Sequence, residues 1–499
     1  MRLGRLSIDC RHPRFGFAFD AIALQISLGW VTALRNAVTR RDGVEDHRLP
    51  VGTARIRPLP VMARQRRPSI IPLSSAQQHW TTPKQAPLSD NRIPLVVRFE
   101  GRLNIRALER ALSDVVDRHE VLRTHYLYDG IAFRQEIRRQ GCFILRHRSV
   151  ASLPIDKRIE AVWEQLNAEF LTPAQLDADV LGLTLFELDK NDHLLGGFVH
   201  HIAFDAVSVR TFWSNVFNAY KSRTLGLGTP SPPELQYADF AIWENDWLAQ
   251  EGTANVAEFW RSHFSSVATL TVPEARKLSV TPAPLGTTPF KLPTENFERA
   301  REFARRRRTT LNPIFLSAFL SVLSVREGVE LVPSSFIIQA RPPRFNRLIG
   351  CFMQFRAMRL DLHGNPNFDE LVVRTRAELF ETSDLRRPLP DRLSNDLELG
   401  QALVNYSMGH YEGGSTQTIS MLGLTVRGFQ FPRDFKTHVT RNIQFAVTQR
   451  PNQLEGQIIY AKDAFDEASA QRFGENVVAF IAKGIDAPES RFSDLVRQR

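Results

Sequence analysis

The chain has 499 residues, of which 43% are hydrophobic, so it contains enough apolar side chains to build more than one core. Its net charge of +10 is concentrated in residues 1–70, which hold 13 arginines and five acidic residues. The nearly neutral remainder argues against a nucleic-acid-binding body, and three widely spaced cysteines argue against a disulfide framework or a zinc site.

The first 69 residues are predicted to be an Arg-rich N-terminal extension, for which disorder and a short packed helix both stay open. Residues 15–34 are mostly apolar and follow several arginines, as in a signal peptide, but Asp20 interrupts them and no small-residue cleavage site is evident. Four prolines between residues 50 and 68 then indicate an extended linker. We predict no membrane span, no bound metal and a cytoplasmic location.

From about residue 95 the pattern alternates between strands and helices. Residues 95–99 form a continuous apolar run that predicts a strand, and Asn104 is typical of the N-cap of the helix that follows and reaches His119. Residues 183–188 and 194–200 predict a hairpin, and residues 207–220 have helical periodicity.

His200 and His201 stand at the end of this second predicted strand, and Asp205 follows at the start of the next helix. A loop at a strand-to-helix junction can expose one imidazole to substrate, and histidine takes up a proton near neutral pH without a large pKa shift. A base supported by a carboxylate is one interpretation. The other is that two histidines close a strand and hydrogen-bond to backbone carbonyls.

The second half of the chain repeats the alternation after a Pro- and Thr-rich connector at residues 273–293. The expected elements are a helix at 313–325, strands at 331–339 and 353–362, and a helix at 368–382. The arginine run 305–308 is typical of a solvated helix end, with a patch for an acidic partner as the alternative. Mixed strands and helices without a Gly-rich nucleotide turn predict α/β or α+β lobes.

Six short strings, in this order, resemble the motifs of condensation domains from nonribosomal peptide synthetases. They are SSAQQHW (74–80), RHEVLRT (118–124), HHIAFDA (200–206), YADFAIW (237–243), IGCFM (349–353) and YAKDAFD (460–466). The chain departs from the family pattern at His79 in place of arginine, at Ala206 in place of glycine, and at Gln354 and Phe355 in place of an Asn-Thr pair. If the family glycine has positive φ, Ala206 strains the loop; otherwise it only narrows the tunnel.

The resemblance implies an α/β (α+β) fold of two chloramphenicol acetyltransferase-like lobes arranged in a V with a central tunnel. We expect the N-terminal lobe at residues 70–265 and the C-terminal lobe at 266–490. It further implies that His201 is the catalytic residue, as a base or by positioning the amine. His200, Asp205, Arg118 and Arg123 are then motif supports, and Asp205 is expected to pair with an arginine such as Arg118 or Arg123.

By resemblance, the function is that of a stand-alone condensation enzyme, which transfers a carrier-bound acyl or peptidyl thioester to an amine and forms an amide. Its partners are acyl or peptidyl carrier proteins that present substrates on 4'-phosphopantetheine, with no permanently bound cofactor, no nucleic acid and no membrane. A monomer is expected, and no adenylation or carrier segment is expected after Arg499. The alternatives are a non-catalytic carrier-docking relative and an ester-forming O-acyltransferase with the same histidine motif; epimerisation domains also share the histidines.

Overall fold

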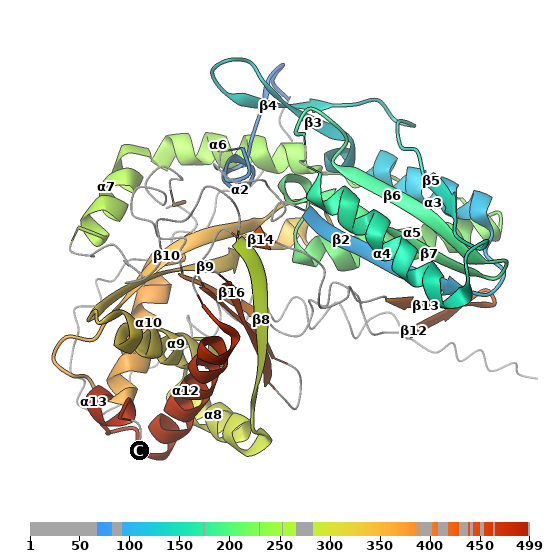
Figure 1. Cartoon of the computed structure of the whole chain (residues 1–499). Helices are drawn as coiled ribbons and strands as arrows, with labels where there is room; N and C mark the ends of the chain where they lie inside the picture. The colour runs from blue at the N-terminus through green and yellow to red at the C-terminus, as the bar shows by residue number, and fades with distance from the viewer. Residues whose placement is uncertain are drawn as a thin grey trace, which may run out of the picture.

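The computed structural model describes residues 67–81, 92–172, 175–228, 230–251, 253–265, 283–384, 388–389, 402–407, 418–428, 438–439, 443–449, 454–462 and 465–497. These residues form two lobes, each built around its own mixed or antiparallel-rich sheet with helices packed on it (Figure 1). The predicted α/β class is therefore confirmed. The predictions for the first 66 residues and for residues 273–282 of the connector lie outside the described residues. The second half of the predicted connector is wrong, because it forms strand β8 (Ala283–Leu292), which pairs antiparallel with β16 in the sheet of the second lobe.

The first lobe is organised by a six-stranded sheet in the order β12-β13-β2-β7-β6-β5. Its central strand β2 is apolar without alternation because both of its faces are covered: Leu95 and Val97 pack with α3 and α5, whereas Val96 packs with α4. The bounds are β2 (Arg92–Glu100), α3 (Ile105–Arg118), β5 (Arg146–Ser149), α4 (Ile155–Leu171), β6 (Leu181–Asp189), β7 (Asp192–His200), η3 (His201–Ala203), α5 (Ala206–Thr224), β12 (Thr418–Met421) and β13 (Leu424–Gly428).

The helix predicted after Asn104 is confirmed as α3. The Asn104 side chain accepts a hydrogen bond from the Ala107 N–H at 3.0 Å, which satisfies one of the free donors at the helix start. Leu108, Leu112 and Val115 are buried along one stripe that faces α5 and the sheet. The predicted hairpin is also confirmed, because β6 and β7 pair antiparallel.

A smaller unit packs against this lobe and carries several of the motif strings. It contains β1 (Ile71–Pro72), α2 (Ser75–Gln78), η2 (Glu120–Arg123), β3 (Thr124–Tyr128), β4 (Phe133–Ile137), α6 (Tyr237–Glu251) and α7 (Thr253–His263), with strand order β1-β4-β3. Arg67 is part of it, since its guanidinium bonds Asp239 and Glu120, each at 2.7 Å. Contacts of the folded body therefore begin before residue 70, within the segment predicted to be an extension.

The second lobe is organised by a seven-stranded sheet in the order β10-β9-β11-β15-β16-β8-β14, whose apolar core is shared with α8, α9, α10 and α12. The predicted elements at 313–325, 331–339, 353–362 and 368–382 are confirmed as α9, β9, β10 and α10. The bounds are β8 (Ala283–Leu292), α8 (Thr294–Arg306), α9 (Leu311–Glu327), β9 (Leu331–Gln339), η4 (Pro343–Phe345), β10 (Met353–Asp361), α10 (Phe368–Thr382), β11 (Ala402–Ser407), β14 (His438–Val439), β15 (Ile443–Gln449), β16 (Leu454–Ala461), α12 (Glu467–Asp486) and α13 (Phe492–Leu495).

The two lobes exchange segments across the predicted boundary at residue 265. Strand β13, from the C-terminal half of the sequence, pairs antiparallel with β2 and so extends the sheet of the first lobe. In the other direction, Trp260 of α7 packs on Ala357 of β10. The position of the boundary itself remains a prediction.

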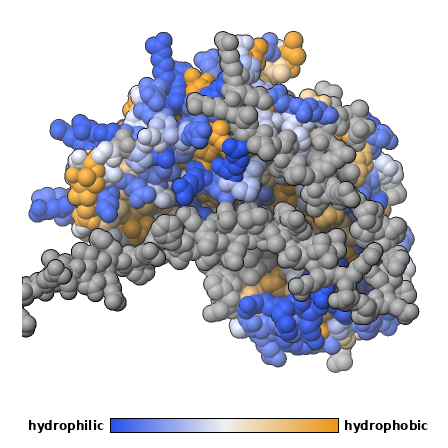
Figure 2. Space-filling view, turned by 180° about the vertical axis from the view of Figure 1, so that it is seen from behind, coloured by the Kyte–Doolittle hydropathy of each residue, from blue (hydrophilic) through white to orange (hydrophobic). Residues whose placement is uncertain are grey.

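In the view of Figure 2, the hydrophobic side chains of the described residues lie in separate small areas among hydrophilic ones. These areas do not join into one broad apolar face in this view. Arg305 is exposed and pairs with Glu302 one turn earlier on α8, in agreement with a solvated helix end. In the part of the chain that the structure describes, no single helix is long and apolar enough to cross a bilayer; α8 and α9 together meet that test, with a bend of 113° between them.

Candidate functional site

The two histidines lie at the junction that the sequence predicted. His200 is the last residue of β7, His201 begins the short helix η3, and Asp205 is the N-cap of α5. The central position of β7 in its sheet fixes the start of this loop, and the N-cap fixes its end. The loop is therefore held at both ends over only a few residues.

His200 has a structural hydrogen bond. Its Nδ1 accepts from the Ile202 N–H at 3.0 Å, and its own backbone N–H donates to the Val180 carbonyl at 2.7 Å. Burial lowers the pKa of His200 to about 3, so the ring is neutral near pH 7. The Nδ1 lone pair is already engaged, which fits the predicted role of His200 as a support.

The His201 ring stacks on the indole of Trp80, with ring centres 4.4 Å apart and planes 11° apart. Burial lowers the pKa of His201 to about 4, although the carboxylate of Asp205 acts in the opposite direction. Among the described residues its buried Nδ1 has no hydrogen-bond partner. A neutral, face-stacked imidazole can offer one nitrogen as a hydrogen-bond acceptor while its orientation stays fixed.

Asp205 is fully buried and its carboxylate is surrounded by donors. Oδ1 accepts from the Ser208 N–H at 2.9 Å, the Ser208 hydroxyl at 2.8 Å and Arg341 Nη2 at 2.8 Å; Oδ2 accepts from Arg341 Nη2 at 3.0 Å and the Phe352 N–H at 3.1 Å. These contacts join α5 of the first lobe to the segment that leads into β10 of the second lobe.

The predicted pairing of Asp205 with an arginine is confirmed, but the two arginines named for it are wrong, because the partner is Arg341 and not Arg118 or Arg123. Arg123 is buried and donates to the Arg138 carbonyl, and the Arg118 carbonyl accepts from Gln236 at 3.1 Å. Neither of these contacts reaches the histidine loop: Arg123 bonds the segment after β4, and Arg118 takes part through its backbone carbonyl. Arg341 lies 136 residues from Asp205, and no local spacing in the sequence indicates the contact.

Arg341 is itself held in place by backbone carbonyls. Its Nη1 donates to the carbonyls of Phe345 at 3.1 Å and Leu348 at 2.5 Å, and its guanidinium lies over the Phe352 ring at 4.0 Å from the ring centre. The arginine is 6% exposed. Both charges of the pair are thus desolvated and hydrogen-bonded, which is the condition under which a buried ion pair is tolerated.

Ala206 occupies the first position of α5. The described non-glycine residues with positive φ are Arg308, Asn365 and Leu422, so Ala206 has an ordinary backbone conformation. The alternative in which alanine strains the loop is therefore excluded. The methyl group adds only volume beside the histidines.

Three motif strings meet at Tyr237. Its hydroxyl lies 2.7 Å from the Ser74 hydroxyl and donates to the Cys351 carbonyl, so SSAQQHW, YADFAIW and IGCFM share one buried contact. Gly350 packs directly under the Tyr237 ring, where a Cβ atom would come within 2.0 Å of a ring carbon. The glycine is thus required by close packing, and the strings that carried the resemblance are neighbours in space.

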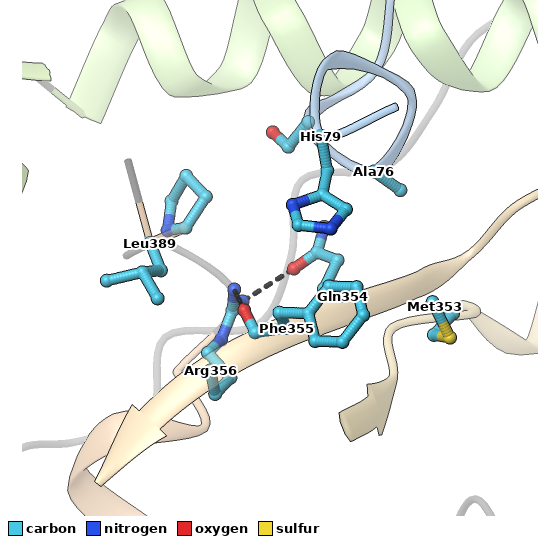
Figure 3. A pocket seen from close by; sticks show the side chains of 9 residues that line it. Ala76, His79, Met353, Gln354, Phe355, Arg356 and Leu389 are labelled. Atoms are coloured by element: carbon cyan, nitrogen blue, oxygen red, sulfur yellow. Dashed lines mark hydrogen bonds between the residues drawn. The ribbon is translucent and has the colours of Figure 1, made fainter. Parts of the chain in front are cut away.

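A small cavity opens beside the histidine loop, between α2 and β10 (Figure 3). Its walls are Ser75, Ala76, His79, Met353, Gln354, Phe355, Arg356, Pro388 and Leu389. The His79 ring contacts Phe355 with ring centres 4.3 Å apart, and the ring centres of Trp80 and the same Phe355 are 6.2 Å apart. Three of the positions that depart from the family pattern, 79, 354 and 355, therefore line one cavity.

One group of possible metal ligands occurs in the described part of the chain: His263 of α7 with Glu378 and Glu381 of α10. His263 Nε2 and Glu378 Oε1 already hydrogen-bond to each other at 2.8 Å, and the same carboxylate oxygen accepts from the Arg359 N–H. The group explains a contact between α7 and α10 and shares no residue with the histidine loop.

The comparisons with known proteins agree on the family. The family model described as Condensation domain matches residues 68–497. The probable non-canonical nonribosomal peptide synthetase (NRPS) CymA of Salinispora arenicola (strain CNS-205) is 27% identical over 456 residues, covering 86% of this chain and 6% of that protein. Isonitrile lipopeptide synthase of Mycobacterium tuberculosis (strain ATCC 25618 / H37Rv) is 27% identical over 501 residues, covering 94% of this chain and 19% of that protein. The chain thus spans a small part of the length of these relatives.

Solved structures show the same fold. The X-domain from teicoplanin biosynthesis matches with a TM-score of 0.75 and 24% identity, covering 88% of this chain and 100% of that chain; it has also been solved in complex with OxyB. The first condensation domain of the calcium-dependent antibiotic synthetase, in complex with a substrate analogue, matches with a TM-score of 0.64 and 18% identity, covering 85% and 98%. The predicted condensation-domain fold is confirmed.

Removing either member of the Asp205–Arg341 pair should be strongly destabilising. We expect Asp205→Ala to lower the free energy of unfolding by about 3–5 kcal/mol, because it leaves a buried guanidinium without its carboxylate. The partly exposed pair Arg98–Asp192 provides a matched control, and Asp192→Ala should cost about 0–1 kcal/mol. Urea unfolding followed by fluorescence measures both. Equal small losses in the two variants would contradict the structural role of Asp205.

Stability should also fall with pH below neutrality. His119 and His200 are buried, and burial lowers the pKa of each to about 3 in the folded chain, whereas histidine in an unfolded chain titrates near ~6.5. The unfolded state therefore binds more protons between these values, and each histidine removes up to about 1.4 kcal/mol of stability per pH unit as the pH falls from ~6.5 towards 3. Urea unfolding at pH 7, 6 and 5 measures this slope.

The variant His119→Leu should make that slope shallower by about one histidine's share, because it removes one of the histidines that the folded state keeps unprotonated. The exposed pair His147–Glu109 supplies the control His147→Leu. A slope that His119→Leu leaves unchanged would show that this ring is protonated in the folded protein.

Proposed function

Because this chain belongs to the condensation-domain family, we propose that it transfers a carrier-bound acyl or peptidyl group to an amine. The family's catalytic members are acyltransferases of nonribosomal peptide and secondary-metabolite biosynthesis. The observation that carries the proposal is the intact histidine loop: His201 is neutral, stacked on Trp80, and set beside a carboxylate that both lobes hold in place. The carboxylate that supports this loop is held by five hydrogen bonds, so the imidazole has a fixed setting in which to meet a substrate.

The reaction that we propose is aminolysis of a thioester. The amine nitrogen attacks the thioester carbon, the C–N bond forms and the C–S bond breaks. The sulfur leaves as the thiol of the 4'-phosphopantetheine arm and takes up the proton that the amine releases. The protein contributes orientation of the two reactants and stabilisation of the charges that develop.

His201 acts in this proposal by positioning the amine. A base with a pKa of about 4 has little driving force to remove a proton near pH 7, whereas its neutral ring is a good hydrogen-bond acceptor. Accepting one N–H of the amine would direct the nitrogen lone pair at the thioester. The stacking of Trp80 on one face restricts rotation of the ring, so the accepting nitrogen keeps its direction.

The partners and setting are proposed with the reaction. Acyl or peptidyl carrier proteins would present donor and acceptor, and the product would be an amide, with an ester as the alternative if the acceptor is a hydroxyl. We further propose that the protein works in the cytoplasm as a monomer without a permanently bound cofactor. These statements rest on the family and on the histidine loop.

A second candidate function is docking without catalysis. The X-domain matches this chain with a TM-score of 0.75, against 0.64 for the condensation domain cited above, and the X-domain is known in complex with another protein, OxyB. The altered cavity positions 354 and 355 fit a member whose acceptor side has changed. In this alternative the histidine loop would serve only to join the lobes.

The variant His201→Ala separates the two candidates. We expect it to abolish amide formation, because the proposed acceptor of the amine N–H is removed. The melting temperature should stay within the range of surface variants, because the variant loses a ring stack on Trp80 but no Nδ1 hydrogen bond to the described residues. Mass spectrometry of acyl-loaded carrier incubated with a panel of amines measures the product. His147→Ala, at an exposed side chain, is the control for removing a histidine.

The conservative variant His201→Gln tests the positioning role further. Glutamine keeps a hydrogen-bond acceptor but cannot act as a base, so partial product with His201→Gln and none with His201→Ala supports positioning. Product from His201→Ala at the rate of the unaltered protein would favour the docking function.

A further inference from the structure

The most unusual side chain near the histidine loop is a buried arginine that the proposed reaction does not use. Arg356 lies on β10 and is 1% exposed. It is the only formally charged residue among those that line the cavity between α2 and β10 in the described part of the chain, and Figure 3 shows its guanidinium directed towards His79, Gln354 and Leu389. Arginine stays protonated in proteins, so this charge is permanent.

The hydrogen bonds of Arg356 within the described residues leave much of its donor capacity unused. Nη2 donates to Gln354 Oε1 at 2.6 Å, and Nη1 reaches the Phe355 carbonyl at 3.4 Å. Nε is buried and has no partner among the described residues. Because a guanidinium carries five N–H donors, the cavity offers several donors that converge on one small space.

Glu244, one of the carboxylates that act on Arg356, does not line the cavity. Glu244 of α6 is bonded by Gln354 Nε2 at 3.1 Å and by the Ser75 N–H at 2.7 Å, so Gln354 stands between Glu244 and Arg356. Burial lowers the pKa of Arg356 to about 10 even though Glu244 and Asp384 both act to raise it.

The cavity has a size that matches a small polar group. Its volume is ≈ 30 Å³, whereas one water needs about 10–15 Å³, so it accommodates a group of two or three heavy atoms. Carboxylates match the planar fork of a guanidinium and form two parallel hydrogen bonds with it. A phosphate carries more charge, and burying it among Ala76, Met353 and Leu389 would be more costly.

The cavity also lies next to the site of reaction. Its wall residue Phe355 contacts Trp80, and Trp80 in turn stacks on the ring of His201. A molecule with its amine at His201 and its far end in the cavity must pass one indole ring. Several bonds must therefore separate the amine from the group that meets Arg356.

We propose that this cavity binds a carboxylate of the acceptor, so that Arg356 selects amines that carry a carboxylate several bonds from the reacting nitrogen. That this ligand is the acceptor rests on the proposed amide-forming function. Its binding to the cavity needs neither a donor nor a reaction. The carboxylate could belong to a free amino acid or to the side chain of a carrier-bound residue; the chemistry that Arg356 recognises is the same in both.

Isothermal titration calorimetry of the full chain with 5-aminopentanoate and with pentylamine tests the binding. We expect 5-aminopentanoate to bind about 10- to 100-fold more tightly, which is the usual contribution of a hydrogen bond to a charged group. The variant Arg356→Met should abolish this preference. Arg301→Met, which removes an exposed arginine paired with Glu298 on α8, should keep it.

A second variant guards against loss of folding. Arg356→Met/Glu244→Gln removes both buried charges together, so no unpaired carboxylate remains, and its melting temperature and circular dichroism report the fold. Glu244→Gln alone retains the bond to Gln354 and should bind 5-aminopentanoate at least as well as the unaltered chain. If Glu244→Gln loses binding as Arg356→Met does, the arginine serves only to pair with Glu244 and the proposal is wrong.

Equal affinity for the two probes, no binding of either, or a preference that survives Arg356→Met would each overturn the proposal. These outcomes are independent of the amide assay with His201→Ala, so failure of the cavity and failure of the proposed function can be told apart. Amide assays with free 5-aminopentanoate and with a glutamyl-loaded carrier then distinguish a free acceptor from a tethered one.

Discussion

The buried ion pair between Asp205 and Arg341 is the interaction on which the site depends. Asp205 caps α5 in the first lobe, and Arg341 precedes β10 of the second, so one desolvated contact sets the histidine loop and the relation of the two lobes together. Such a pair is a weak source of net stability, because desolvation offsets most of the attraction. The pair instead specifies the conformation of the loop. Because five donor contacts meet on the carboxylate, few other arrangements of the loop satisfy both charges.

The consequence for His201 is that its ring is partly buried and held in one orientation by the stack on Trp80. This burial lowers the pKa of the imidazole and keeps it neutral. Proton abstraction near neutral pH is then inefficient, but hydrogen-bond acceptance is not. The tie between the lobes and the protonation state of the histidine therefore depend on the same junction.

Local elements of this chain could be predicted from sequence because their signals are local. Asn104, the stripe through Leu108 and the continuous apolar strand at 95–99 each reflect a neighbour within a few residues or the coverage of a sheet face. The partner of Asp205 could not be predicted in this way. Arg341 is distant in the sequence, and nothing in the sequence favours it over Arg118 or Arg123. The fold places those two beside Gln236 and Arg138. The contribution of Arg67 was missed because prolines and arginines around it resembled a linker.

The cavity shows why departures from a family pattern are informative when they are placed in space. Position 79 is far in sequence from the adjacent positions 354 and 355, and nothing in the sequence connects them. In the structure their side chains line the same cavity as Arg356. Gln354 is long enough to touch both Arg356 and Glu244, and so it keeps two opposite buried charges at a fixed separation. By accepting from Arg356 Nη2, Gln354 fixes one side of the guanidinium at the cavity, and in the proposed carboxylate site the altered positions 79, 354 and 355 would act together.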